Sequence, residues 1–184
     1  MKIAMETQVQ PSTGQSALTH LRSATLILCG ALMLAGCLSL CTGAQAAPPD
    51  YLKLLARAGI EPIVITGRDS PAVRRRVADL GLRHAIYGVS DKLAAAEPLL
   101  EQLGLSWPQV AAIGDDWPDL PLLTRAGFAC APANAHAEVQ AVAHHVTTRG
   151  GGDGAAREFC DLLLMAAGRY AELLRSHLHT LDGR

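Results

Sequence analysis

Three short polar groups in the sequence carry side chains of the kinds that bind ligands. The first is Thr66-Gly67-Arg68, the second is Ser90-Asp91-Lys92, and the third is Asp115-Asp116-Trp117-Pro118-Asp119. Together they offer hydroxyl, guanidinium, ammonium and carboxylate groups within about fifty residues of chain. Each group alone also has a plain structural explanation, since polar residues at the ends of elements often cap a helix or face water. Their positions relative to the predicted strands decide between the two interpretations.

Short apolar strands alternate with amphipathic helices from Asp50 onward, and this alternation predicts an α/β fold with a parallel sheet. Pro62–Thr66 is a β-branched run that reads as a buried strand. Further strands are expected at 84–87, 110–114, 128–131 and 145–147, and helices at 51–58, 70–80, 90–103, 118–125 and 154–174.

The three polar groups fall where these strands and helices meet. Thr66 ends the first predicted strand, Asp115 follows the third, and Lys92 lies at the start of the helix between them. In an open parallel sheet, ligands bind in the crevice beyond the carboxyl ends of the strands. We therefore expect the three groups to form one site.

Composition excludes several other classes of protein. The net charge is -1 and aromatic residues make up 4% of the 184 residues, so the chain has neither the basic field nor the stacking surface of a nucleic-acid-binding protein. No CxxC pair or Cys/His cluster has the spacing of a zinc site. Cys130 and Cys160 are expected to be buried without forming a disulfide.

The first 49 residues read differently from the rest. Residues 24–40 are uncharged and apolar, Ala44-Gln45-Ala46 resembles a secretory cleavage site, and Leu34-Ala35-Gly36-Cys37 resembles a bacterial lipobox. Three interpretations stand: export by cleavage or by lipidation at Cys37, an uncleaved membrane anchor, or a shifted reading frame or incorrect start. A membrane partner, and a place in the periplasm or at the membrane, are expected only if this segment is a genuine signal.

The order Thr-Gly-Arg, Lys and Gly-Asp-Asp-x-x-Asp resembles motifs II, III and IV of the haloacid dehalogenase (HAD) superfamily. Longer stretches, at 53–68, 87–92, 113–119 and 146–158, are similar to the Kdo 8-phosphate phosphatase branch of that superfamily. The resemblance runs from about Lys53 to Leu174. It implies a HAD-like Rossmannoid parallel sheet with flanking helices, over residues 50–176, followed by a frayed tail at 177–184.

The resemblance implies Mg²⁺-dependent hydrolysis of a phosphomonoester on a small sugar acid, a step in lipopolysaccharide biosynthesis. It also implies a homotetramer in the cytoplasm. Thr66 would bind the phosphoryl group and Lys92 would neutralise its charge. Asp115 would hold Mg²⁺, Asp116 is a weaker candidate ligand, and Asp119 would support the metal shell or Lys92.

Three further residues are implied as contacts for the substrate: Gly67, Arg68 and Arg157. For both arginines, a contact with a neighbouring subunit is the alternative role. The run Gly150–Gly154 precedes a predicted helix, so its backbone N–H groups are expected to face an anion.

The catalytic nucleophile of the family is missing from the sequence. HAD phosphatases begin with a strand that ends in Asp-x-Asp, which supplies the nucleophile and the general acid/base. Before Thr66 the chain has only three carboxylates, Glu6, Asp50 and Glu61, and none lies in such a motif. We therefore expect a sheet without its first strand, with residues 1–49 outside the fold. Its unpaired neighbours would make the chain marginally stable and prone to aggregate, and phosphatase turnover would be absent.

Three functions remain open at this stage. The first is a Kdo 8-phosphate phosphatase whose amino-terminal sequence is altered. The second is an exported or lipid-anchored binding protein of HAD-like fold without catalysis. The third is a phosphatase of a related nonulosonate 9-phosphate.

Overall fold

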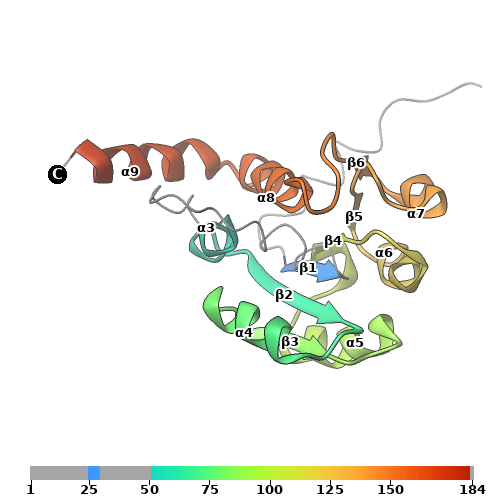
Figure 1. Cartoon of the computed structure of the whole chain (residues 1–184). Coiled ribbons are helices and arrows are strands. Elements are labelled where there is room, and N and C mark those ends of the chain that lie inside the picture. The colour runs from blue at the N-terminus through green and yellow to red at the C-terminus, as the bar shows by residue number, and fades with distance from the viewer. Residues whose placement is uncertain (1–24, 30–50, 183–184) are drawn as a thin grey trace, which may run out of the picture.

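A computed structural model describes residues 25–29 and 51–182 of the 184-residue chain. Within these residues the core of the fold is a sheet of six strands in the order β3-β2-β1-β4-β5-β6, and every neighbouring pair is parallel (Figure 1). The α/β class predicted from the sequence is confirmed. The strands are β1 (Thr25–Cys29), β2 (Glu61–Thr66), β3 (His84–Tyr87), β4 (Val110–Ile113), β5 (Phe128–Ala131) and β6 (His145–Val146).

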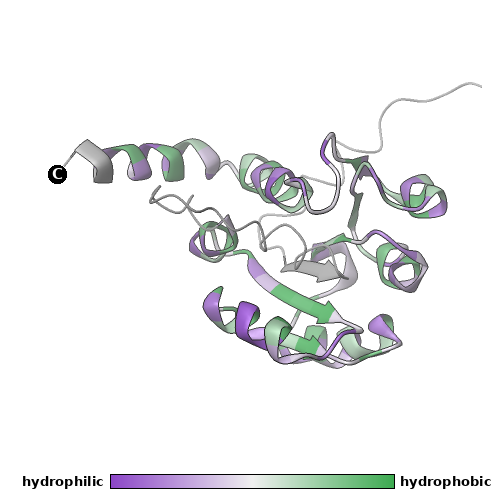
Figure 2. Ribbon diagram, viewed as in Figure 1, coloured by the Kyte–Doolittle hydropathy of each residue, from purple (hydrophilic) through white to green (hydrophobic). Residues whose placement is uncertain are grey.

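Helices cover both faces of the sheet. One apolar cluster joins the sheet to α3, α4 and α8, and a second joins it to α5, α6 and α7. Hydrophilic residues gather along much of α4, whereas β2 is hydrophobic over most of its length (Figure 2). The helices are α3 (Tyr51–Arg57), α4 (Pro71–Asp79), α5 (Lys92–Gln102), α6 (Leu120–Leu123), α7 (Ala137–Val142), α8 (Ala155–Ala166) and α9 (Tyr170–Asp182), with 3₁₀ turns η2 (Trp107–Gln109) and η3 (Trp117–Asp119).

The middle of the sheet corrects one prediction. The sequence predicts that the first strand is missing and that residues 1–49 lie outside the fold, but Thr25–Cys29 occupies the place between β2 and β4. The segment Thr-Leu-Ile-Leu-Cys is uncharged and apolar, as the inner strands of parallel sheets are. The lipobox-like and cleavage-like motifs at 34–37 and 44–46 lie outside the described residues.

Because β1 fills this place, the neighbouring strands keep their ladder partners. Cys29 pairs with Ile65 of β2 and Leu28 with Ile113 of β4, and both isoleucine side chains are fully buried. The exposed apolar edge expected from the sequence does not arise at β2 or β4. The sequence predicts marginal stability because these strands would be unpaired. Since they are paired, marginal stability stays a prediction without that reason.

The end of the chain also differs from the prediction of one helix at 154–174 and a frayed tail at 177–184. The helix divides into α8 and α9 at Gly168, whose φ of 69° is in the left-handed region that ends helices. The second part then continues to Asp182. In the part of the chain that the structure describes, none of the helices is both long enough and apolar enough to cross a membrane.

Replacing Ile27 by proline is expected to lower the free energy of unfolding by about 3 kcal/mol or more, because proline cannot donate to the ladder of a central strand. Denaturation in urea measures the loss. The control is Ala137→Pro at the first position of α7, where proline is tolerated. Equal stability of the Ile27→Pro variant and the unaltered protein would mean that Thr25–Cys29 is not in the sheet.

Candidate active site

The three polar groups predicted from the sequence meet in one pocket of about 620 Å³ beyond the carboxyl ends of β2 and β4. Parallel strands bring their carboxyl ends to the same edge, so residues distant in sequence converge there. The lining residues are Thr66, Gly67, Arg68, Gly88, Val89, Ser90, Lys92, Asp115, Asp116, Pro118 and Asp119.

A buried ion pair forms the floor of this pocket. The Nζ atom of Lys92 donates a hydrogen bond to Oδ1 of Asp119, and the two side chains are only 6% and 1% exposed. The other oxygen of Asp119 accepts the backbone N–H groups of Asp115 and Asp116, at 3.0 and 3.2 Å. Asp119 thus fixes both the lysine and the loop that carries Asp115.

These contacts suit the supporting role expected for Asp119. Both of its carboxylate oxygens accept hydrogen bonds from protein donors, so Asp119 holds Lys92 and the Asp115 loop from behind the site. Gly114 makes this packing possible, because a Cβ atom there would lie 2.5 Å from the Cβ of Asp119. A glycine is therefore required before Asp115 for steric reasons.

Asp115 is the carboxylate of this loop with the least favourable surroundings for its charge. Burial raises its pKa above the ordinary value, and the neighbouring Asp119 raises it further, against an opposing effect of Lys92. The negative charge is thus only partly compensated by the protein. A divalent cation bound to Asp115 would offset it.

The described residues fit a Mg²⁺ ion only in part. Asp115 has the hard oxygen donors that Mg²⁺ prefers. The Oδ1 atom of Asp116 instead accepts the N–H of Trp117 at 2.8 Å and caps η3. Among residues 25–29 and 51–182 there is no group of three or more His, Cys, Asp or Glu side chains that could hold a metal ion. Asp115 would supply one ligand to such an ion, and water, the substrate or residues outside the described ranges would complete its coordination.

Thr66 is oriented to donate a hydrogen bond. Its side chain is 1% exposed, and its Oγ1 atom accepts the backbone N–H of Arg68 at 3.1 Å. Because this contact uses a lone pair, the hydroxyl proton remains available to an oxygen of a ligand. Gly67 is held closely too, since a Cβ atom there would lie 3.3 Å from the carbonyl oxygen of Val89.

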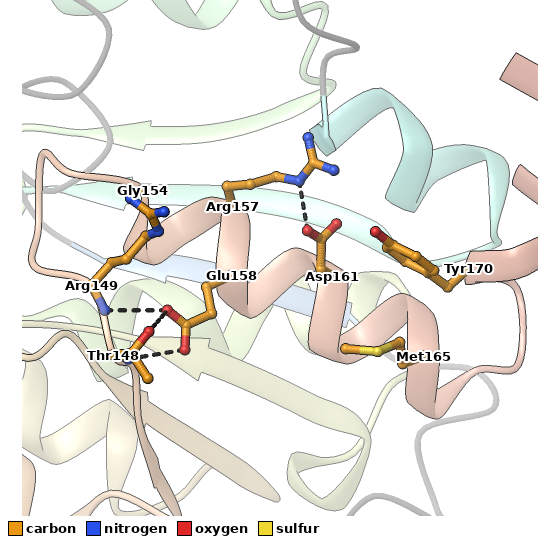
Figure 3. Close-up of a pocket in the computed structure, with 8 residues that line it drawn as sticks. All are labelled: Thr148, Arg149, Gly154, Arg157, Glu158, Asp161, Met165 and Tyr170. Carbon is orange, nitrogen blue, oxygen red and sulfur yellow. Dashed lines mark hydrogen bonds and ion pairs between the residues drawn. The ribbon is translucent and has the colours of Figure 1, made fainter. Parts of the chain in front are cut away.

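Arg157 does not share this pocket. It lies on α8 in a separate pocket of about 690 Å³, where its Nε atom donates to Oδ2 of Asp161 at 2.8 Å (Figure 3). The hydrogen bond from this guanidinium to Asp161 raises the pKa of Arg157. Arg157 does not line the pocket that contains Thr66, and its predicted contact with the substrate or with a neighbouring subunit stays a prediction.

The glycine-rich segment before α8 also belongs to the second pocket, which Gly154 lines (Figure 3). The N–H of Gly151 donates to Oδ1 of Asn134 at 2.6 Å, and the N–H of Asp153 donates to the carbonyl oxygen of Gly150 at 3.0 Å. Protein acceptors thus occupy N–H groups that the sequence suggested for an anion.

Sequence reasoning missed the residues that hold the Asp115 loop from the side of β5. The backbone N–H of His136 donates to the carbonyl oxygen of Asp115 at 3.0 Å. The Nε1 atom of Trp117 donates to Nδ1 of His136, also at 3.0 Å. No motif marks His136, because its contact depends on where the loop after β5 passes.

Comparisons with known proteins agree with this architecture. Residues 86–159 match the family model described as haloacid dehalogenase-like hydrolase. The 3-deoxy-D-manno-octulosonate 8-phosphate phosphatase of Haemophilus influenzae is 42% identical over 118 residues, which are 64% of this chain and 66% of the relative. The enzyme of that name from Escherichia coli K12 is 44% identical over 113 residues, or 61% and 60% of the two chains. The chain thus spans less than two thirds of the length of these relatives.

Solved structures of the same kind superimpose over more of the chain. A 3-deoxy-D-manno-octulosonate 8-phosphate phosphatase from Moraxella catarrhalis, in complex with magnesium, phosphate and Kdo, has a TM-score of 0.77 at 30% identity. The match covers 91% of this chain and 99% of that one. The cobalt-bound phosphatase from Haemophilus influenzae has a TM-score of 0.71 at 33% identity, over 82% and 93% of the chains.

The chain therefore belongs to the haloacid dehalogenase-like hydrolases, in their branch of Kdo 8-phosphate phosphatases. This confirms the resemblance predicted from the motifs. The branch consists of phosphatases, and solved members carry a divalent metal ion.

Proposed function

We propose that the pocket of Thr66, Lys92 and Asp115 binds the phosphate group of a phosphorylated 3-deoxy sugar acid of the Kdo 8-phosphate type. The single observation that carries the proposal is that these three side chains line one pocket at the carboxyl edge of the sheet. The relatives bear the name of that substrate. With the substrate, we propose the homotetrameric assembly and the cytoplasmic location expected for the family.

Each side chain has a task that follows from its surroundings. The Thr66 hydroxyl donates to a phosphoryl oxygen, and the ammonium group of Lys92 balances the phosphate charge while Asp119 keeps it in place. Arg68 and the backbone of Gly67 lie at the same pocket and contact the rest of the substrate. Mg²⁺, held by Asp115, would neutralise the phosphate oxygens when bound.

Hydrolysis needs a nucleophile that the chain does not contain in the expected place. β1 carries no carboxylate, and the sequence has neither Asp nor Glu between Glu6 and Asp50. The chain as written therefore binds its phosphate ester without turning it over. This observation favours, as a second candidate, a binding protein of phosphatase fold.

Binding can be measured by calorimetry with Kdo 8-phosphate in the presence and absence of Mg²⁺. We expect saturable binding that needs Mg²⁺ and that is lost in Asp115→Asn. The same substitution should raise the stability of the metal-free protein at pH 7, because it removes a carboxylate whose pKa is raised on folding.

The raised pKa of Asp115 means that its charged form is less favourable in the folded protein than in the unfolded chain. The carboxylate therefore lowers stability once the pH exceeds the pKa of the unfolded group, and this loss disappears as the pH falls. Binding that is unchanged in Asp115→Asn, or independent of Mg²⁺, would contradict the proposed role of this carboxylate. Asp161→Asn, in the other pocket, is the matched control.

A further inference from the structure

Two loops line one side of the pocket, and the side chain of Arg74, which lies outside the pocket, contacts a residue next to each loop. The loop after β2 contributes Thr66, Gly67 and Arg68, and the loop after β3 contributes Gly88, Val89 and Ser90. Arg74 lies on the first turns of α4 and is not among the residues that line the pocket. Its contacts nevertheless reach both loops.

The first contact of Arg74 is a bidentate pair with Asp69. Its Nε and Nη2 atoms donate to Oδ1 and Oδ2 of Asp69 at 2.6 and 2.8 Å. Such paired bonds fix the relative orientation of the two planar groups. The hydrogen bond from Arg74 lowers the pKa of Asp69. Asp69 directly follows Arg68, and the pair therefore fixes the end of the Thr-Gly-Arg segment.

The second contact of Arg74 is with the end of β3. Its guanidinium carbon lies 4.4 Å from the centre of the Tyr87 ring, a cation–π contact. Tyr87 directly precedes Gly88, which has a φ of 68° and turns the chain into the pocket. A Cβ atom on Gly88 would lie 3.6 Å from the Cβ of Asp69. The two loops therefore approach each other beside Arg74.

We propose that Arg74 is a positioning residue that sets the separation of these two loops, and with it the affinity of the pocket for a phosphate group. The inference rests on the proposed function. The backbone bond from Val89 N–H to the carbonyl oxygen of Thr66, at 3.3 Å, is where the two loops join. It is long for an N–H···O bond, so it alone holds them weakly.

If Arg74 only stabilised the fold as a whole, its removal would lower the melting temperature. The side chains of Arg74 and Asp69 are 56% and 44% exposed, and exposed ion pairs contribute little to global stability. Removing Arg74 should therefore leave the melting temperature nearly unchanged while it loosens the wall of the pocket. The melting temperature and the looseness of the pocket loops can be measured separately.

The test compares the unaltered protein with Arg74→Ala, with the exchanged pair Asp69→Arg/Arg74→Asp, and with Arg75→Ala as the control on the same helix. Amide hydrogen exchange without ligand should quicken about 10-fold at Val89 in Arg74→Ala and remain unchanged in α8. Inorganic phosphate with Mg²⁺, followed by NMR shifts of pocket amides, should bind about 10-fold more weakly, since small misplacements of binding groups are costly. The exchanged pair should restore only part of both, because it rebuilds the ion pair but an aspartate at position 74 cannot make the cation–π contact with Tyr87.

The outcomes separate the inference from the proposed function. Unchanged exchange at Val89, or phosphate affinity in Arg74→Ala equal to that of the unaltered protein, overturns the inference alone. Failure of the unaltered protein to bind phosphate with Mg²⁺ overturns the proposed function and the inference together. A large fall in melting temperature in Arg74→Ala also counts against it, because the residue would then be a support of the whole fold.

Discussion

Replacing Lys92 by methionine is expected to lower the free energy of unfolding by about 3 to 5 kcal/mol, the usual cost of leaving one partner of a buried ion pair without the other. Asp119 would keep its two backbone donors, but its carboxylate, which is only 1% exposed, would lose the ammonium group that balances its charge. Phosphate binding should disappear in the same variant. Urea denaturation at pH 7 measures the first effect and calorimetry the second.

Two further variants distinguish the effect of breaking the ion pair from the effect of removing a long side chain. Arg75→Met removes an exposed cation and should change stability by less than about 0.5 kcal/mol. Lys92→Met/Asp119→Asn should be more stable than Lys92→Met alone, because no buried charge is then unbalanced and the asparagine oxygen can still accept the N–H groups. A double variant no more stable than the single one would show that packing, and not charge, dominates at this position.

The second large effect is a gain of catalysis. The unaltered chain is expected to release no phosphate from Kdo 8-phosphate with Mg²⁺. Gly30→Asp/Leu32→Asp places an Asp-x-Asp directly after β1 in sequence and should raise phosphate release to about 10³-fold or more above the rate without protein, the order of magnitude that a nucleophile contributes. β1 ends beside the strands that lead to Thr66 and Asp115, so the added carboxylates would follow the strand that the family uses.

Single substitutions and a metal-site control make this prediction specific. Gly30→Asp alone should release at most one equivalent of the sugar acid slowly and keep the phosphoryl group as an aspartyl phosphate, because the second carboxylate, which protonates the leaving group and then activates water, is missing. Adding Asp115→Asn to the double variant should remove the activity again. Activity in the unaltered chain, or a double variant as inactive as its parent, would contradict the assignment of the missing groups.

Much of the site was predictable because strand ends are visible in the sequence. The β-branched run before Thr66 and the small apolar run before Asp115 mark two parallel strands that flank β1, and the geometry of such sheets brings their ends to the same edge. Lys92 was predictable from its place at the start of α5. The use of both Asp119 oxygens was not, because it depends on the tight turn at Gly114.

The prediction that residues 1–49 lie outside the fold was wrong for a physical reason. The segment Thr25–Cys29 has the composition of a signal sequence and of an inner strand alike, since both environments select uncharged apolar residues, and sequence pattern alone could not separate them. The placement of Arg157 in another pocket on α8 was not visible in the sequence either, and its predicted contact with the substrate or a neighbouring subunit stays a prediction. Contacts across the fold, such as that of His136 with Asp115, leave no periodic signal.

The position of β1 makes the folding of this chain depend on timing. Thr25–Cys29 leaves the ribosome early, but its partner strand β4 begins at Val110, 85 residues later (110 minus 25). Pairing across such a distance is slow compared with local structure. Until β4 is made, Thr25–Cys29 has no second strand to pair with. A translocon or chaperone that bound it in this interval would leave β4 and the strands after it without β1 as a partner.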